Sequence, residues 1–236
     1  MSIQLDGALV TTTMRTPGHD YELAVGFCIT DGLLDGAPVT GVRYCADGSA
    51  MASAFNVVTV ETGGRASAPT SRLGNVSSSC GWCGREQLDE LSERLDPLPA
   101  RPADHLDLDL LAAVPDRVLD GQGLFASTGA VHAAAAFDAA GEIVLVREDV
   151  GRHNAVDKIV GALALERPGR LPANDLGLFV SGRASIEMVQ KAWAAGFRAL
   201  VAVSAPTALA VATAERAGLQ LAGFARDGSL EIYVDG

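Results

Sequence analysis

The second half of the chain alternates strand-length apolar runs with segments in which apolar residues recur at helical spacing. Strands separated by helices return to one sheet through crossovers, which is typical of a largely parallel sheet covered by helices on its faces. The pattern predicts strands at 176–180, 199–203 and 219–224, and helices at 154–165, 185–195 and 208–217. We therefore expect an α/β fold whose regular core lies in this half.

Three more features precede this alternation. The apolar runs Val131–Phe137 and Glu142–Val146 flank the turn residues 138–141 and predict a β-hairpin. Leucines at helical spacing predict a helix over about 85–95. A proline-rich break at 96–102 then separates this helix from the rest of the chain.

The N-terminal segment predicts a small α+β unit. Alternating apolar residues from Ile3 indicate a strand that ends at Met14, and turn and capping residues then precede a helix over about 21–33. A second strand is expected at 53–60. The stretch 62–79 is rich in Gly, Ser, Ala and Thr, a composition typical of a flexible loop.

A chain of 236 residues suggests one larger domain or two modest ones that share a core. We divide it into a small α+β domain at 1–78, which ends in the flexible loop, and an α/β domain at 79–236. The sequence shows no internal repeat.

Composition excludes several classes of protein. The 48% hydrophobic content suffices for a buried core, but no apolar run approaches the roughly 18–20 residues of a membrane span. The first residues lack the basic and then apolar pattern of a signal peptide, so we expect a cytoplasmic protein. A net charge of −11 argues against nucleic-acid binding, which needs clustered Lys and Arg. It leaves room for a small anionic ligand.

Cys80 and Cys83 are the only closely spaced cysteines of the four in the chain. The predicted helix that follows them places the pair at a helix N-terminus, where the dipole favours the nucleophilic thiolate. A second cysteine two residues away can resolve or relay sulfur exchange. A zinc half-site is the alternative, but it needs a second close Cys/His pair that the chain lacks, so we predict no metal.

Polar loops follow three strands of the second half, at 181–183, 204–207 and 225–228. In an open α/β sheet such loops gather at the carboxyl edge, where ligands bind. The first two lead into helices and offer unpaired backbone N–H groups to an anion, while Arg183 and Arg226 could each form bidentate contacts with phosphate. Taken singly, each loop is better explained as an ordinary solvated connection, whereas three such loops at one edge favour ligand binding.

Two further polar segments could serve either function or structure, and for the first of them the two are equally open. The stretch Arg147–Asn154 leaves a strand and starts a helix, so it can reach the same edge. In the structural alternative, Asp149 or Asn154 caps the helix and Arg147 pairs with Glu148. His132 could also face a ligand or be a satisfied core histidine, and the core role is the commoner one for a lone histidine.

Taken together, these motifs resemble the formate dehydrogenase accessory sulfurtransferase (FdhD/NarQ) family, and the resemblance spans nearly the whole chain. The stretches that carry it are 14–27, 78–84, 128–134, 147–158, 181–192 and 204–207. Ala130 departs from the pattern, since a second glycine is common there.

The resemblance implies a function that spacing alone does not. Members of the family take persulfide sulfur from a cysteine desulfurase and pass it to the molybdenum or tungsten bis(guanine dinucleotide) cofactor, which is then inserted into the catalytic subunit of formate dehydrogenase. By motif, Cys80 matches the persulfide-carrying cysteine and Cys83 its partner.

The same resemblance implies a fold and a cofactor site. The family fold is similar to cytidine deaminases, a three-layer α/β/α core with a smaller α+β N-terminal domain, usually as a homodimer. Its cofactor-binding stretch matches Phe224, Ala225, Arg226, Asp227, Gly228 and Ser229, to which we add Ser181, Arg183 and His132 from the strand-end argument.

Two alternatives remain once zinc-dependent deamination is excluded. Zinc-dependent deamination needs His-x-Glu ahead of Pro-Cys-x-x-Cys, whereas here Ala133 and Ala134 follow His132 and the cysteine pair lies upstream. A non-catalytic chaperone of the molybdenum cofactor would use the cysteines only to hold the ligand. A dithiol oxidoreductase would form a stable Cys80–Cys83 disulfide, but it leaves the arginine-containing loops unexplained.

Overall fold

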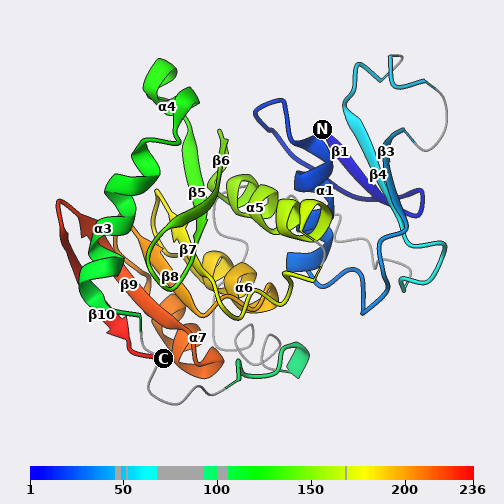
Figure 1. Ribbon diagram of the computed structural model, residues 1–236. Helices are drawn as coiled ribbons and strands as arrows, with labels where there is room; N and C mark the ends of the chain where they lie inside the picture. The colour runs from blue at the N-terminus through cyan, green and yellow to red at the C-terminus, as the bar shows by residue number, and fades with distance from the viewer. Residues whose placement is uncertain (46–48, 52, 68–92, 100–105, 168) are drawn as a thin grey trace.

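Two β-sheets and six helices organise the residues that the computed structural model describes, which are 1–45, 49–51, 53–67, 93–99, 106–167 and 169–236 (Figure 1). The larger sheet has the order β10-β9-β8-β7-β5-β6. Its strands are β5 (His132–Phe137), β6 (Ile143–Asp149), β7 (Gly177–Val180), β8 (Ala199–Ala202), β9 (Gln220–Arg226) and β10 (Ser229–Val234). None of the described helices is long and apolar enough to cross a membrane.

The larger sheet is mixed, so the prediction of a largely parallel sheet is wrong. Only β7–β8 and β8–β9 pair in parallel, whereas β5 pairs antiparallel with both β6 and β7, and β10 pairs antiparallel with β9. The crossover argument holds for the three strands that helices connect. It fails at both ends of the sheet because hairpins add strands there without a crossover.

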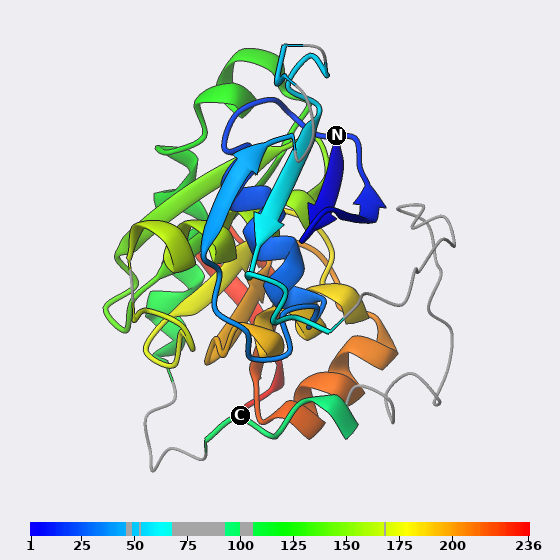
Figure 2. The same ribbon diagram turned by 90° about the vertical axis from the view of Figure 1, so that its right-hand side faces the viewer.

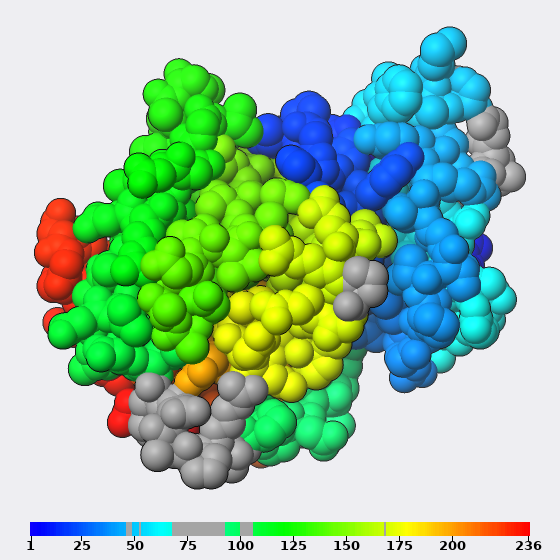
Figure 3. All heavy atoms as spheres, viewed as in Figure 1, coloured from blue at the N-terminus to red at the C-terminus, as the bar shows by residue number. Residues whose placement is uncertain are grey.

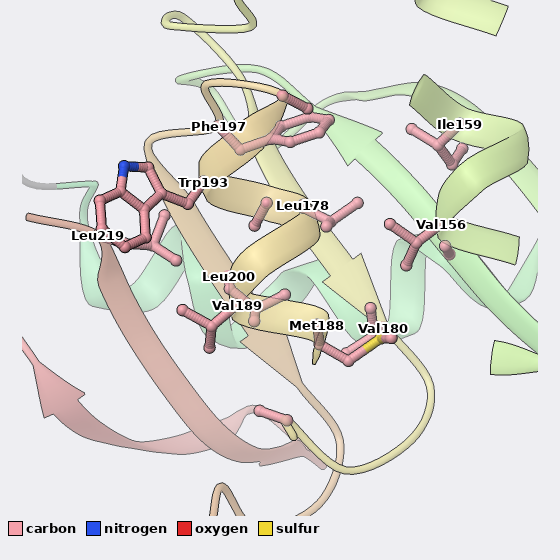
Figure 4. Packing of buried hydrophobic residues seen from close by; sticks show 14 of the residues in the cluster. Val156, Ile159, Leu178, Val180, Met188, Val189, Trp193, Phe197, Leu200 and Leu219 are labelled. Carbon is pink, nitrogen blue, oxygen red and sulfur yellow. The ribbon is translucent and has the colours of Figure 1, made fainter. Parts of the chain in front are cut away.

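Helices cover both faces of this sheet in three α/β/α layers. On one face, α3 (Leu108–Leu119) packs on alternate residues of β5, β8 and β9. The other face carries α5 (Arg152–Glu166), α6 (Ile186–Ala194) and α7 (Ala208–Ala217). Figure 4 shows this core, with Val156 and Ile159 of α5 and Met188, Val189 and Trp193 of α6 beside Leu178, Val180 and Leu200 of the sheet. These helices and strands match the predicted alternation to within about three residues at their ends.

The smaller sheet has the order β2-β1-β4-β3 and is formed by the N-terminal segment (Figure 2). Its strands are β1 (Ser2–Leu5), β2 (Ala8–Thr12), β3 (Gly41–Tyr44) and β4 (Val57–Glu61), and α1 (Asp20–Thr30) packs on it. The predicted single strand from Ile3 to Met14 is wrong, because Asp6 and Gly7 adopt positive φ values of 46° and 87° and turn the chain into a β1–β2 hairpin.

Several elements escaped sequence-based prediction. Pro115 lies inside α3, where its missing N–H makes the segment an unfavourable helix, and burial of apolar side chains such as Leu111 and Val114 overrides that preference. β10 follows a tight Asp227–Gly228 turn, which is a strong hairpin signal. Also missed were β3 and the short α4 (Gly123–Thr128), which buries no residue.

The two parts of the chain meet where α1 crosses α5. A Cβ atom added at Gly26 of α1 would overlap the carbonyl oxygen of Asp157, and one added at Gly161 of α5 would overlap that of Glu22. The helix backbones therefore touch directly, and Figure 3 shows the N-terminal segment packed against the larger part. The predicted domain boundary at 78/79 lies outside the described residues, as does most of the predicted helix over 85–95.

We expect Gly161→Ala to lower the free energy of unfolding by about 3 kcal/mol or more, because the new methyl group meets backbone that cannot rotate away. Helix propensity alone would favour alanine over glycine by about 1 kcal/mol. The steric overlap with the α1 backbone acts in the opposite direction and should outweigh that preference. Urea unfolding measures the difference.

Gly123→Ala is the matched control, since a Cβ atom there has no heavy atom within 4 Å. It should leave the urea midpoint unchanged or raise it slightly. Equal midpoints for the native protein and Gly161→Ala would contradict the contact.

Candidate functional site

One edge of the larger sheet collects the ends of five strands. The parallel strands β7, β8 and β9 all end there. Because β5 runs antiparallel to β7, it begins at this edge, and β6, antiparallel to β5, ends there. Helices α5, α6 and α7 follow β6, β7 and β8 directly, so all three start at the same edge. We call it the carboxyl edge.

Backbone hydrogen bonds join the strand-end loops across this edge. The Ser204 N–H donates to the carbonyl of Gly182 at 3.3 Å, and the Phe224 N–H donates to the carbonyl of Ser204 at 3.4 Å. The loops after β7 and β8 meet again where the Thr207 N–H reaches the carbonyl of Ala184 at 3.0 Å. The predicted gathering of these loops is therefore confirmed, while ligand binding by them stays a prediction.

His132 and Ser181 lie together at the centre of the carboxyl edge. The His132 Nδ1 atom is 3.3 Å from the Ser181 hydroxyl, which also accepts a hydrogen bond from the Ala133 N–H at 2.9 Å. Burial and, secondarily, the Arg152 guanidinium lower the pKa of His132 below its usual value. His132 is thus a half-buried neutral imidazole at neutral pH, able to donate or accept a hydrogen bond according to its tautomer.

The predicted cofactor stretch Phe224–Ser229 comprises the end of β9 and the hairpin to β10. Arg226, Asp227, Gly228 and Ser229 are exposed, as is Arg183 in the loop after β7. The ring of Phe224 is 36% exposed, with a φ of 51°. Ala225 differs from the rest because its side chain is completely buried under α3, so only its backbone can face a ligand.

Cys80 and Cys83 lie outside the described residues, and the site that they are predicted to form has no described geometry. The other two cysteines are both buried. Burial raises the pKa of the Cys28 thiol to about 12, so this cysteine is an inert part of the core. Cys45 lies 2.9 Å from the Ser53 hydroxyl.

Of the predicted loop at 62–79, the described part is held by side-chain hydrogen bonds. The backbone N–H of Thr62 donates to Asp6 at 2.8 Å, and the Thr62 hydroxyl donates to the same carboxylate. That hydroxyl also accepts from the N–H of Ala66 at 3.0 Å. The start of this range is therefore tied to β1, and residues 68–79 lie outside the described part of the chain.

The polar stretch Arg147–Asn154 is mainly structural. The expected Arg147–Glu148 pair is wrong, since Arg147 forms a bidentate ion pair with Glu22 of α1, at 2.6 and 2.9 Å. Burial would raise the pKa of Glu22, but hydrogen bonds from Arg147 and His19 hold it below its usual value. The partner was unpredictable because it lies 125 residues away.

Asp149 and Asn154 connect the start of α5 to the loop before α1. The Asp149 carboxylate accepts hydrogen bonds from the N–H groups of Thr16 at 3.1 Å and Gly151 at 2.9 Å, and it pairs with buried Lys158 at 2.7 Å. The Asn154 amide donates to the carbonyl of Met14 at 2.7 Å. The capping alternative is wrong, because the N-cap of α5 is Gly151, without a side-chain cap hydrogen bond, and Asp149 instead holds the turn just before the helix through the Gly151 N–H.

A cavity of about 420 Å³ is lined in part by residues of this junction, and no sequence signal indicated it. Its walls include His19, Leu124, Arg147, Glu148 and Lys158. Each of these charged groups already has a partner. The Glu148 carboxylate, for instance, accepts hydrogen bonds from the N–H groups of Leu124 and Phe125 at 2.9 and 2.7 Å, which holds α4 in place.

Sequence reasoning also missed two residues in the first turn of α5. Arg152 reaches Gly182 and His132 at the carboxyl edge, as described below. His153 is mostly buried, and burial together with the charges of Lys191 and Arg152 lowers its pKa to about 4, against the opposing charges of Glu187 and Asp31. The only signal for either residue was its place in the polar stretch 147–154.

The fold and this edge define a mixed α/β protein in which polar loops from five strand ends converge beside three helix N-termini. The sequence pattern of the FdhD/NarQ family matches residues 1–236, and the chain belongs to this family.

Individual relatives also match this chain over nearly its whole length. It is 45% identical to a sulfur carrier protein FdhD of Mycolicibacterium paratuberculosis, over 99% of this chain and 87% of the relative. It is 44% identical to a protein of the same name from Streptomyces avermitilis, over 99% and 84%. A crystal structure named as a proposed formate dehydrogenase accessory protein, from Desulfotalea psychrophila, superposes with a TM-score of 0.75 at 22% identity, covering 99% and 85% of the two chains. That structure supports the fold.

We expect the stability of the protein to fall as pH drops from about 6.5 to about 4, partly because of His153. The unfolded chain takes up a proton at the ordinary histidine pKa, whereas the folded state resists it, so protonation favours unfolding within this window. His153→Gln should flatten the slope of unfolding free energy against pH there, by about 3 kcal/mol across the window.

Urea unfolding between pH 4 and 7.5 makes this comparison. Above pH 7 the two proteins should show similar dependence on pH, because neither carries a charge at this position. Parallel curves at all pH values would contradict a depressed pKa for His153.

Proposed function

We propose that this chain is a sulfur carrier that moves persulfide sulfur from a cysteine desulfurase to the molybdenum or tungsten bis(guanine dinucleotide) cofactor, as required for formate dehydrogenase activity. The observation that carries the proposal is the pair Cys80 and Cys83 in a chain 45% identical to a named sulfur carrier protein. The protein acts as a sulfurtransferase in the cytoplasm, as a homodimer, and its partners are the desulfurase and the catalytic subunit of formate dehydrogenase.

The proposed chemistry uses Cys80 as nucleophile. Its thiolate attacks the outer sulfur of the desulfurase persulfide, forming a new S–S bond on Cys80 while the desulfurase cysteine leaves as a thiolate. The transfer moves one sulfur atom with no net oxidation or reduction. Cys83 either tunes the thiolate or relays the sulfur, since it lies two residues away.

The carboxyl edge is the proposed docking place of the cofactor, which is here the acceptor substrate. Ligands of open α/β sheets bind outside the carboxyl ends of the strands. The pyrophosphate groups of the cofactor carry negative charge. Arg183 and Arg226, both exposed at this edge, can neutralise that charge. His132, Ser181 and the stretch Phe224–Ser229 supply hydrogen-bonding groups around them. The three α/β/α layers agree with the proposed deaminase-like core.

Two other functions use the same residues differently. In a chaperone of the molybdenum cofactor the cysteines would hold the ligand without carrying sulfur, and in a dithiol oxidoreductase they would cycle through a disulfide. The loops that converge at the carboxyl edge favour a protein with a bulky anionic ligand over a simple redox couple.

We expect Cys80→Ser to abolish the persulfide that forms when the protein is incubated with a cysteine desulfurase and cysteine, because serine offers no thiolate. Intact-protein mass spectrometry should show a mass increase of one sulfur atom on the native protein, and peptide mapping should place it on Cys80. Formate dehydrogenase activity should fail to recover in cells that carry only this variant.

Cys45→Ser is the matched control, since it replaces a buried thiol by a hydroxyl that can keep the contact with Ser53. It should acquire the sulfur atom normally. If the Cys80→Ser protein restored formate dehydrogenase activity, the chaperone would be the better explanation, and a reversible Cys80–Cys83 disulfide without added sulfur would favour the oxidoreductase.

A further inference from the structure

Arg152 has an unusual position at the carboxyl edge. It is the first residue of α5, directly after Gly151, which caps the helix without a side-chain hydrogen bond. Its Nε atom is buried and has no hydrogen-bond partner among the described residues. Since buried polar groups are almost always hydrogen-bonded in folded proteins, an orphaned guanidinium N–H indicates a missing partner.

Three elements converge on this arginine. A Cβ atom built on Gly182, in the loop after β7, would lie 3.5 Å from Cδ of Arg152 and 3.6 Å from Cε1 of His132. The two basic side chains therefore flank the same glycine. Ser181, next to Gly182, binds His132 through its hydroxyl, at 3.3 Å from Nδ1. The three side chains form a cluster of hydrogen-bonding groups around a position without a side chain.

The charges around Arg152 are unbalanced. The positive charge of its guanidinium contributes to the lowered pKa of both His132 and His153. The acidic group that its charge influences is Glu187 of α6: burial would raise the pKa of Glu187, but hydrogen bonding and the charges of His153 and Arg152 hold it below its usual value. Among the described residues, no carboxylate lies within ion-pair distance of Arg152, so its charge is available to an incoming anion.

Arg170 shows that a buried N–H group without a partner does not by itself indicate an anion-binding site. Its Nε atom is also buried without a partner, but the rest of its guanidinium pairs with Asp175 at 2.8 Å. It precedes β7, at the opposite edge of the sheet from the strand-end loops. Arg152 differs because His132, Ser181 and the bare backbone of Gly182 converge with it.

We propose that Arg152, His132 and Ser181 form an oxyanion site that holds a phosphate or pyrophosphate group of the ligand. Arg152 supplies the charge and a planar set of N–H donors, which suits bidentate contact with phosphate oxygens. The neutral imidazole and the hydroxyl supply directed hydrogen bonds, and Gly182 lets the anion approach the backbone. The site rests on the proposed function only for the identity of the natural ligand.

A bound anion should leave a signature on His132. The anion offsets the positive charge of Arg152, which disfavours the protonated form of His132. It can also accept a hydrogen bond from the protonated imidazole. Binding of inorganic pyrophosphate should therefore raise the pKa of His132, observed as an upward shift in the midpoint of its carbon-bound proton resonance. The resonance is assigned by its absence from the His132→Gln protein.

The test is a titration of the full chain with inorganic pyrophosphate, followed by NMR and by calorimetry. Native protein should bind and show the upward shift of the His132 midpoint. Arg152→Gln should bind about tenfold more weakly or worse, because it loses a charge-assisted contact, and should lose the shift. Arg170→Gln removes one positive charge at the opposite edge and should bind like the native protein.

Arg152→Lys is a second variant that controls for misfolding of Arg152→Gln. It keeps the positive charge and removes only the planar set of N–H donors. It should retain part of the affinity, with the His132 shift still present. The proposal is overturned if pyrophosphate leaves the His132 midpoint of native protein unchanged, or if Arg152→Gln and Arg170→Gln bind it equally. Sulfur loading of Cys80 is measured separately, so failure of this site and failure of the sulfur-carrier function are distinguishable.

Discussion

The backbone contact between α1 and α5 is the constraint on which the rest of the structure depends. Glycines at 26 and 161 let the two helices approach until each would-be Cβ atom meets the partner's carbonyl. That approach brings α1 within reach of a buried polar group between three helices. Asp157 of α5 pairs with Lys191 of α6 at 2.8 Å and accepts a hydrogen bond from Thr30 of α1 at 2.7 Å. A wider crossing would take the Thr30 hydroxyl away from both Asp157 and Lys191 and leave hydrogen-bonding groups of this buried ion pair unsatisfied.

The same crossing explains the structural role of the residues that join two polar stretches far apart in the sequence. Residues 14–27 and 147–158 join through Asp149, Asn154 and the Arg147–Glu22 pair, which satisfy one another. They fix the end of β6 and the entry to α5, and so set where Arg152 lies relative to β7. Structural residues of this junction therefore help to position the carboxyl edge.

Sequence reasoning predicted the candidate site in part. Loops after consecutive parallel strands must meet at one edge, so Ser181, Ser204 and Phe224 could be grouped without coordinates. His132 was a candidate but undecided, because its neighbour Ser181 lies 49 residues away. Arg152 was inconspicuous within a charged stretch, and only its orphaned Nε and its position beside Gly182 distinguish it. Cys80 and Cys83 were identified from their spacing, which is a local property.

The sequence by itself determined the local features: the alternation of helices and strands after residue 150, the paired cysteines and the family. These depend on periodicity and short spacings, which neighbouring residues specify. Only the tertiary structure decided that the central sheet is mixed, that α3 forms despite Pro115, and that Arg147 binds Glu22 instead of Glu148. Such outcomes depend on which apolar surfaces, distant in the sequence, are buried against one another. They also depend on which charged groups are brought close enough to pair. That competition is resolved when the helices and sheets pack, and it leaves no local pattern in the chain.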